Sequence, residues 1–330
     1  MKINSTTFDS FVKNALVQWR TGYERVQKGA VDLYDMSMNE NLTSEFSTID
    51  GFTFARRKTE GDDHFQASPN QGYTKNMTKY RVSLKATITW EMRKYDKYRE
   101  MKKTLSGLGE ASAQRMELDL THRFTFGTAT TYVDMDGVTV NITVADGLAL
   151  FSTVHTVTGS STTFRNRVAN NPQFSKGGIE AAETLFTSQM IDHSGNKVVV
   201  TPDTIISTDD PNTVNTIREF LASTAAPEGA HEGITNVYRS KYMHKVLPYL
   251  ATTNTGAYDS TKAKYWMLAS VAHTDAVVEV SEAPHMTAPT PGGNAEDFDN
   301  EDWNFSTSAA YGIEIVDSRW IVLSSGDGTA

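Results

Sequence analysis

Residues 78–127 read TKYRVSLKATITWEMRKYDKYREMKKTLSGLGEASAQRMELDLTHRFTFG, and their hydrophobic period changes partway along. Over Tyr80–Trp90 apolar and polar residues alternate, which is typical of a half-buried β-strand. Beyond this strand the apolar residues recur every three or four positions, which indicates one face of a helix. The residues of this face are Tyr98, Met101, Leu105, Leu108, Ser112, Met116, Leu120 and Phe124.

The predicted helix is unusually long. No proline interrupts Arg93–Gly127, so a helix over this whole range would measure roughly 50 Å. Gly107 and Gly109 lie inside it, and because glycine is a poor helix former we expect a bend or break there. A helix of this length must cross a wide structure, pack along a partner or form the edge of an assembly unit.

The N-terminal residues predict an amphipathic helix. Thr6 followed by Asp9 is a plausible helix start, and the apolar residues of one stripe are Phe8, Phe11, Val12, Ala15, Leu16 and Trp19. A polar, aperiodic segment follows up to residue 50. Two interpretations stay open: an arm that gains order on a neighbouring surface, or a helix that packs on its own domain.

A long hairpin is predicted for residues 51–90. Gly51–Thr59 would be its first strand and Tyr80–Trp90 its return strand. The connection, residues 60–78, is longer than an ordinary hairpin turn, so it is functional, disordered or ordered by another chain. The alternative is a solvated, exposed hairpin. The positive bias of this region comes from Arg56, Arg57, Lys58, Lys75, Lys79, Arg81 and Lys85.

The remainder of the chain predicts a mixed α+β structure without an internal repeat or repeated βαβ units. Helices are predicted at Lys176–Met190 and Asn212–Ala222. An alternating segment with a turn at Asp136-Gly137 is predicted over Tyr132–Val144. The predicted strands include Tyr265–Ser270, Val277–Val280, Ser306–Val316 and Ser318–Leu323.

Composition excludes several classes of protein. There is no cysteine, which rules out disulfides and thiolate chemistry. No run of about 18 apolar residues is present, so no membrane span is predicted. The net charge of −9 is uneven: residues 1–130 hold 20 Lys and Arg against 16 Asp and Glu, and residues 131–330 hold 11 against 24. This is not the overall balance of a tight nucleic-acid binder.

The search for catalytic chemistry finds no motif. No GxGxxG, P-loop, GxSxG or HExxH pattern occurs, and the eight histidines include no pair at i,i+4 spacing. The acidic run 296–302 is interpreted as a solvated loop, and His155 as a hydrogen-bonded histidine. Tyr95, Lys97, Tyr98 and Arg99 could stack nucleic-acid bases or form core with a rim of long basic side chains. We therefore predict no enzyme, no metal and no cofactor.

Five segments, taken in order, resemble a known family. They are Lys79–Tyr98, Asp146–Val157 (DGLALFSTVHTV), Lys197–Thr224, His244–Ser270 and Tyr311–Trp320 (YGIEIVDSRW). Each is weak alone, but together their order and spacing resemble the major capsid proteins of tailed phages, which have the Hong Kong 97-type fold.

The resemblance implies an α+β fold with four parts. Residues 1–45 would be an N-terminal arm and 46–90 an extended loop, both lying over neighbouring subunits. Residues 91–200 and 304–330 would form a peripheral domain with a spine helix at 93–127 on the inner side of a shell. Residues 201–303 would form an axial domain. The interface residues that we expect from the arm and loop are Phe8, Phe11, Trp19, Arg56, Arg57, Lys58, Lys75 and Lys79.

The function implied by the resemblance is that of a structural shell protein of the virion, assembled in the host bacterial cytoplasm. Its partners would be other copies in pentamers and hexamers, neighbouring capsomers, and packaged double-stranded DNA through weak, non-specific contact. They would also include a portal, a separate scaffolding protein and a possible decoration protein, but no membrane. Because the arm-like helix begins close to Met1, no long N-terminal scaffolding segment is expected.

Two alternatives stay open at this point. An encapsulin-type nanocompartment has the same fold and encloses cargo proteins instead of DNA. A soluble hydrolase or carbohydrate-binding domain would instead need a concave site with converging titratable groups, which these residues do not suggest.

Overall fold

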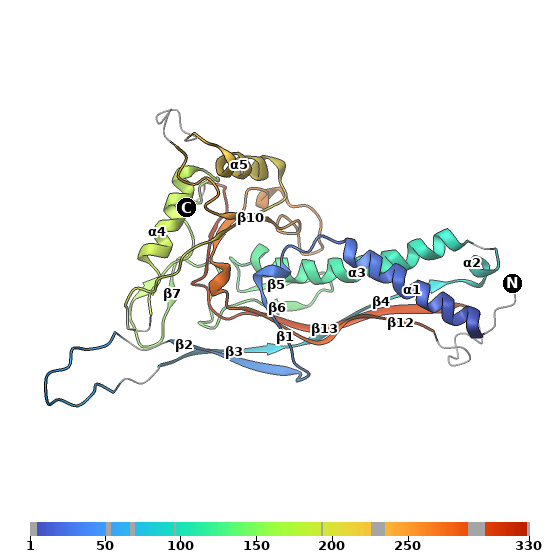
Figure 1. The fold of residues 1–330 in the computed structure, drawn as a ribbon, viewed down its shortest axis with the longest axis horizontal. Helices are drawn as coiled ribbons and strands as arrows, with labels where there is room; N and C mark the ends of the chain where they lie inside the picture. Colours follow the sequence, from blue (N-terminus) through green and yellow to red (C-terminus); the bar gives the residue numbers. More distant parts are fainter. Residues whose placement is uncertain are drawn as a thin grey trace.

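The computed structural model describes residues 5–50, 54–66, 70–95, 97–192, 194–225, 235–289 and 301–328. Within these residues the body holds two four-stranded sheets. A long helix runs alongside the first sheet, and a narrow hairpin leaves the body at the end opposite the N-terminus (Figure 1). The predicted mixture of helices and strands is confirmed.

The first sheet has the order β1-β12-β13-β4. Its strands are β1 (Asp35–Met38), β12 (Ala276–Thr287), β13 (Trp303–Ile315) and β4 (Tyr80–Ile88). β4 pairs antiparallel with β13, from Tyr80 opposite Tyr311 to Ile88 opposite Trp303. The strand predicted at Tyr80–Trp90 is therefore confirmed. Its predicted partner, Gly51–Thr59, is wrong, because the opposite strand comes from the far end of the chain.

The predicted helix over Arg93–Gly127 consists of two helices. A short helix, α2 (Trp90–Lys94), precedes α3 (Tyr98–Thr125). The Thr89 hydroxyl accepts a hydrogen bond from the Met92 amide at 3.4 Å and so caps α2. One side of α3 packs in the core clusters with residues of the first sheet and of α1. The buried apolar side chains on that side include Met101, Leu105, Leu108, Met116, Leu120 and Phe124.

The expected bend or break at Gly107 and Gly109 is not a break, because α3 is continuous through both residues. Gly109 is needed for another reason. A Cβ at this position would lie 2.0 Å from the Trp19 carbonyl oxygen of α1 (Ser5–Arg25), which runs along α3 (Figure 1). On α1, a Cβ at Gly22 would equally lie 2.0 Å from the Ser106 carbonyl. The two glycines thus let the two helix backbones approach closely. At Gly107 a Cβ would meet nothing within 4 Å.

The second sheet has the order β10-β9-β11-β14. Its strands are β10 (Met243–Val246), β9 (Thr204–Ser207), β11 (Trp266–Ala269) and β14 (Ile321–Ser324), and it packs with α4 (Lys176–Ser188) and α5 (Pro211–Ala222). Ser175 and Asp210 cap these helices, each accepting a hydrogen bond from a backbone amide of the first turn. Two short strand pairs, β5 (Thr131–Val133) with β6 (Thr139–Asn141) and β7 (His155–Thr156) with β8 (Thr163–Phe164), connect the two parts.

The hairpin consists of β2 (Thr43–Asp50) and β3 (Asn70–Thr78), paired antiparallel. Residues 54–59 are not a strand, and residues 51–53 lie outside the described part of the chain. Both strands of the observed hairpin therefore lie earlier in the sequence than the predicted strands Gly51–Thr59 and Tyr80–Trp90. Lys79 separates β3 from β4, so the continuous run 70–88 divides into one strand of the hairpin and one strand of the body.

The domain boundaries that the resemblance implied stay a prediction. β14 and α4, both assigned there to the peripheral domain, contribute to the core cluster of the second sheet through Val322, Leu185 and Phe186. Among the described helices, none combines the length and hydropathy that crossing a membrane requires.

Candidate assembly surfaces

One face of strand β3 lies against the body of its own chain. Tyr73, Lys75, Met77 and Lys79 are partly or fully buried, whereas Thr74, Asn76 and Thr78 between them are exposed. This alternation is the period of two of a strand that covers another surface. Met77 is fully buried, and its sulfur would lie only 2.7 Å from a Cβ at Gly312. The part of the hairpin nearest the body is therefore docked, not free.

A buried ion pair fastens the end of β3 to β12. The Lys79 Nζ lies 2.8 Å from the Glu279 carboxylate, and the two side chains are 2% and 8% exposed. Glu279 also accepts hydrogen bonds from Ser44 and Asn39, while Lys79 donates to the Asn41 carbonyl. Burial acts to raise the pKa of Glu279, but the hydrogen bonds from Lys79, Ser44 and Asn39 bring it below the ordinary value. Both strands of the hairpin are tied to one carboxylate.

A second ion pair lies further along β3. The Lys75 Nζ is 3.7 Å from the Glu314 carboxylate of β13 and donates a hydrogen bond of 3.1 Å to the Thr143 hydroxyl. Burial raises the pKa of Glu314, although the charges of Arg123 and Lys75 oppose this. The contacts of Lys75 and Lys79 thus fix the direction in which the hairpin leaves the body.

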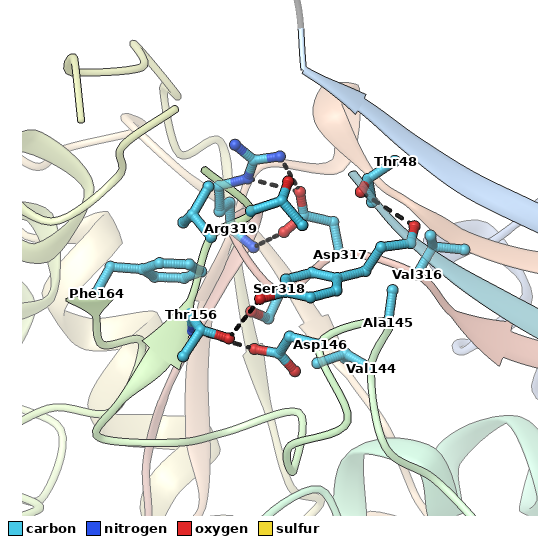
Figure 2. Close-up of a pocket in the computed structure, with 13 residues that line it drawn as sticks. Thr48, Val144, Ala145, Asp146, Thr156, Phe164, Val316, Asp317, Ser318 and Arg319 are labelled. Carbon is cyan, nitrogen blue, oxygen red and sulfur yellow. Dashed lines mark hydrogen bonds and ion pairs between the residues drawn. The ribbon is translucent and has the colours of Figure 1, made fainter. Parts of the chain in front are cut away.

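The last contact between the hairpin and the body lies beside a small cavity of about 30 Å³. The Tyr73 hydroxyl is 3.0 Å from the Thr156 hydroxyl. Figure 2 shows Thr48 on one side of this cavity and Asp146 and Thr156 on the other. The space is about that of a water molecule, so it is a packing gap between two surfaces and not a substrate site.

Beyond these contacts, the described part of the hairpin loop packs on no surface of its own chain. All of residues 54–66 are exposed. Phe54 is 74% exposed and Phe65 is 53% exposed, and the Arg56 guanidinium lies 4.0 Å from the centre of the Phe65 ring. Arg57 and Lys58 are exposed beside them. Exposed aromatic side chains gathered on one loop are typical of a contact surface.

Helix α1 is packed on its own chain, as the second of the two interpretations held. Trp19 is 6% exposed and stacks on Tyr23 with ring centres 5.4 Å apart. The Phe11 ring lies 5.1 Å from that of Trp303. The side chain of Phe8 lies outside the described residues.

The interface residues predicted from the sequence therefore divide into two groups. Arg56, Arg57 and Lys58 lie on the exposed loop. Trp19 and Lys79 are buried against their own chain and Lys75 is largely so, and contact of these three residues with neighbouring subunits stays a prediction. The sequence did hold a signal for the lysines, since Tyr73, Lys75, Met77 and Lys79 alternate with small polar residues. Glu279 and Glu314, which they bind, were not predicted.

Two buried titratable groups of the body, Asp119 and His155, are held by hydrogen bonds to neighbouring side chains. Asp119 accepts hydrogen bonds from Tyr311 at 2.7 Å, Arg115 at 2.9 Å and Tyr80 at 3.1 Å. His155 is fully buried, with its ring nitrogens 2.8 Å from Asp146 and 3.2 Å from Asn166, which confirms the hydrogen-bonded histidine predicted there. No cluster of three or more metal-ligating side chains occurs in the described part of the chain. Most of the acidic run 296–302 lies outside it.

A surface groove of about 630 Å³ lies between α3, β4 and the loops at 135–136 and 249–256. Its charged residues include Arg81, Arg115 and Asp136, and Arg115 pairs with Asp136 at 2.8 Å. The Asp136 carboxylate is thus held by Arg115, and among the described residues that line the groove there is no histidine and no second carboxylate.

Comparison with known proteins gives one family and one shared fold. Residues 74–324 match the family described as phage capsid protein. No curated protein matches the chain. Among solved structures, a chain of the procapsid of bacteriophage JBD30 superimposes with a TM-score of 0.51 at 10% identity, covering 98% of this chain and 76% of that one.

Two further solved structures are more distant in shape. A chain of Mycobacterium phage Ogopogo gives a TM-score of 0.44 at 11% identity, covering 91% of this chain and 92% of its own. A chain of a virus-like particle from Pyrococcus furiosus gives a TM-score of 0.46 at 12% identity, covering 94% of this chain and 97% of its own. The fold assignment rests on the procapsid chain, and it confirms the predicted Hong Kong 97-type fold.

Proposed function

Since this chain belongs to the phage capsid protein family, we propose that its copies form pentamers and hexamers which close into the head shell of a tailed phage around double-stranded DNA. It is a structural major capsid protein, and its place is the capsid of the virion. The proposal adds the arrangement of the copies, the enclosed DNA, assembly in the host bacterial cytoplasm and the absence of a catalytic step. A portal, a separate scaffolding protein and a possible decoration protein belong to the same proposal.

The observation that carries the proposal is the division of the β2–β3 hairpin into a docked base and an exposed loop. The two lysine–glutamate pairs hold the base in one direction, whereas residues 54–66 contact no core of their own chain. A loop that is held in place but unsupported is suited to a surface supplied by a neighbouring copy. Many weak contacts of this kind add up in a closed symmetric assembly.

The encapsulin-type alternative predicts the same hairpin but different contents. The family match favours the phage capsid over this alternative. The contents of purified particles separate the two, because nucleic acid would support the capsid and enzyme cargo would support a nanocompartment.

The test removes the contact groups of the exposed loop without touching its base. We expect Phe54→Ser with Phe65→Ser to leave the circular dichroism spectrum unchanged and to prevent the formation of shells seen by negative-stain microscopy. Glu60→Gln with Gln66→Asn serves as the control, since it changes the same loop but keeps both rings and the three cations. Shells of normal yield from the phenylalanine variant would contradict the assigned role of the loop.

A second result bears on the function as a whole. If the unchanged chain stays a monomer under every assembly condition, with and without added scaffolding protein, the shell function itself is wrong. If the unchanged chain forms shells and the phenylalanine variant forms them equally well, only the loop assignment is wrong.

A further inference from the structure

A basic surface lies around the start of α3, in a protein that is acidic as a whole. Residues 90–103 hold six Lys and Arg against three Asp and Glu, whereas the whole chain has a net charge of −9. Five of these cations are exposed: Lys94, Lys97, Arg99, Lys102 and Lys103. We call these five residues the basic patch.

Three members of the basic patch lie close together on the first turns of α3. Arg99, Lys102 and Lys103 are three and four positions apart, so they are neighbours on the helix surface. Lys102 and Lys103 also line a surface groove of about 310 Å³ together with Gln18 and Arg25 of α1. The cation that α1 contributes to this groove, Arg25, is itself paired with Glu110 at 2.7 Å.

The charges of the basic patch are little used within the chain. The Lys97 Nζ lies 3.7 Å from the Glu100 carboxylate, but both side chains are more than half exposed, and such surface pairs are weak. Lys94 and Lys102 lie over the rings of Trp90 and Tyr98 at 4.0 and 4.5 Å. A lysine over a ring keeps its full positive charge. Within the described residues no carboxylate pairs with Lys94, Arg99, Lys102 or Lys103.

The chemistry of the groove favours a polyanion that is contacted through charge alone. Its other lining residues are Ser106, Gly107 and Glu110, so no hydrophobic side chain forms its floor. An amphipathic acidic helix would need such a floor to bury its apolar face. A nucleic-acid backbone does not, because Lys and Arg bind its phosphates without a pocket.

We propose that the basic patch binds the phosphate backbone of double-stranded DNA on the inner side of the shell, without reading its sequence. This rests on the proposed function, which supplies the DNA. Residues 131–330 carry 24 Asp and Glu against 11 Lys and Arg, so they repel DNA on balance. The other exposed cluster of cations, Arg56, Arg57 and Lys58, lies on the loop that the proposed function assigns to a neighbouring copy, which leaves the patch for DNA. Binding by one subunit is weak and falls steeply with salt, since each phosphate contact contributes about −0.9 to the slope of log K against log salt concentration.

The test is a salt titration of the purified, unassembled full-length chain with a fluorescent 30-base-pair duplex of random sequence, read by anisotropy. With all five cations in contact the slope would be about −4.5. We expect Arg99→Gln/Lys102→Gln/Lys103→Gln to reduce the slope by about 2.7, because three contacts are lost. The matched control is Lys197→Gln/Arg239→Gln/Lys264→Gln, which removes three exposed cations elsewhere and should leave the slope unchanged.

Several results would overturn the assignment. An unchanged slope and affinity in the patch variant would place the DNA contact elsewhere or nowhere. If polyglutamate binds and the duplex does not, the patch is a site for an acidic polypeptide. Should the triple variant fail to fold by circular dichroism, Lys103→Gln alone must reduce the slope by about 0.9 for the proposal to stand.

Shell formation is scored on the same preparations by negative-stain microscopy, which keeps the two proposals apart. Shells from the patch variant together with weakened duplex binding support both proposals. If the patch variant and the control variant both form shells and bind the duplex equally well, the result counts against the DNA contact of the patch only. No shells from the unchanged chain count against the proposed function, whatever the anisotropy shows.

Discussion

Replacing Glu279 by glutamine tests whether the buried ion pair holds the β2–β3 hairpin on the body. The amide keeps the size of the side chain and an oxygen that can accept from Ser44 and Asn39. It removes the negative charge that lies 2.8 Å from the Lys79 ammonium. Lys79, whose side chain is 2% exposed, is then a buried cation without a counter-charge, and its other polar contact is the Asn41 carbonyl.

The expected loss follows from the cost of breaking a buried pair, which is about 3–5 kcal/mol when one partner is removed. Unfolding entropy is about 2.1 cal/mol/K per residue, which gives roughly 0.7 kcal/mol/K for this 330-residue chain. The melting temperature should therefore fall by about 4–7 °C. If the hairpin leaves the body first, Lys79 becomes hydrated, the fall is smaller, and the amides of β3 exchange faster instead.

The assay is differential scanning calorimetry together with hydrogen exchange over residues 70–78. Glu282→Gln is the control on the same strand. Glu282 lies 3.5 Å from Arg81, and their side chains are 42% and 64% exposed, so its loss should cost about 1 kcal/mol or less. The double variant Lys79→Met with Glu279→Gln removes the unpaired charge and should recover most of the lost stability. The reasoning fails if Glu279→Gln matches Glu282→Gln in both measurements.

The same pair sets a pH dependence. The pKa of Glu279 in the fold is below its ordinary value of 4.5, through its hydrogen bonds and the charge of Lys79. Its contribution to stability is thus present above about pH 4.5 and is lost as the pH falls through the pKa in the fold. The difference in unfolding free energy between the unchanged chain and Glu279→Gln should be constant from pH 6 to 7 and shrink below about pH 4.5.

Two further changes test the packing of the body. Gly109→Ala should lower the free energy of unfolding by about 1–3 kcal/mol, because the new Cβ meets the Trp19 carbonyl of α1. Gly107→Ala, where the new Cβ meets nothing, should raise it by about 0.5–1 kcal/mol. Equal effects of the two variants in urea denaturation would refute the close approach of α1 and α3 at Gly109. Burial, with the charges of Lys262 and Arg115, lowers the pKa of His122 to about 4, so stability should fall by roughly 3 kcal/mol between pH 6.5 and 4. His122→Gln should flatten that part of the profile, and an NMR titration with a midpoint near 6.5 would contradict it.

Local periodicity in the sequence determined most of the individual elements. The predicted helices Lys176–Met190 and Asn212–Ala222 correspond to α4 and α5, and the predicted strand Tyr265–Ser270 corresponds to β11. These predictions succeed because a side-chain period of two or about 3.6 is set by neighbours in the chain. The family resemblance also came from short segments in order, and the family match to residues 74–324 confirmed it.

Pairing between distant segments was decided only by the tertiary structure. β4 was predicted correctly as a strand, but its partner β13 begins more than 200 residues later, at Trp303. Alternation tells which residues face the same side of a strand and not which strand lies beside it. The predicted pairing of β4 with Gly51–Thr59 rested only on nearness in sequence, which does not fix the partner of a strand.

The same limit applies to the hairpin and to α3. The sequence supplied Lys75 and Lys79 as charged residues of a long loop, for which exposure is the usual expectation. The fold buries them, because Glu314 and Glu279 reach them from β13 and β12. The low helix propensity of Gly109 predicted a bend or break, whereas the role of this glycine is to allow the close approach of α1. A residue's type and its neighbours in the chain fix its local preferences, but what it touches across the fold depends on contacts that no single segment contains.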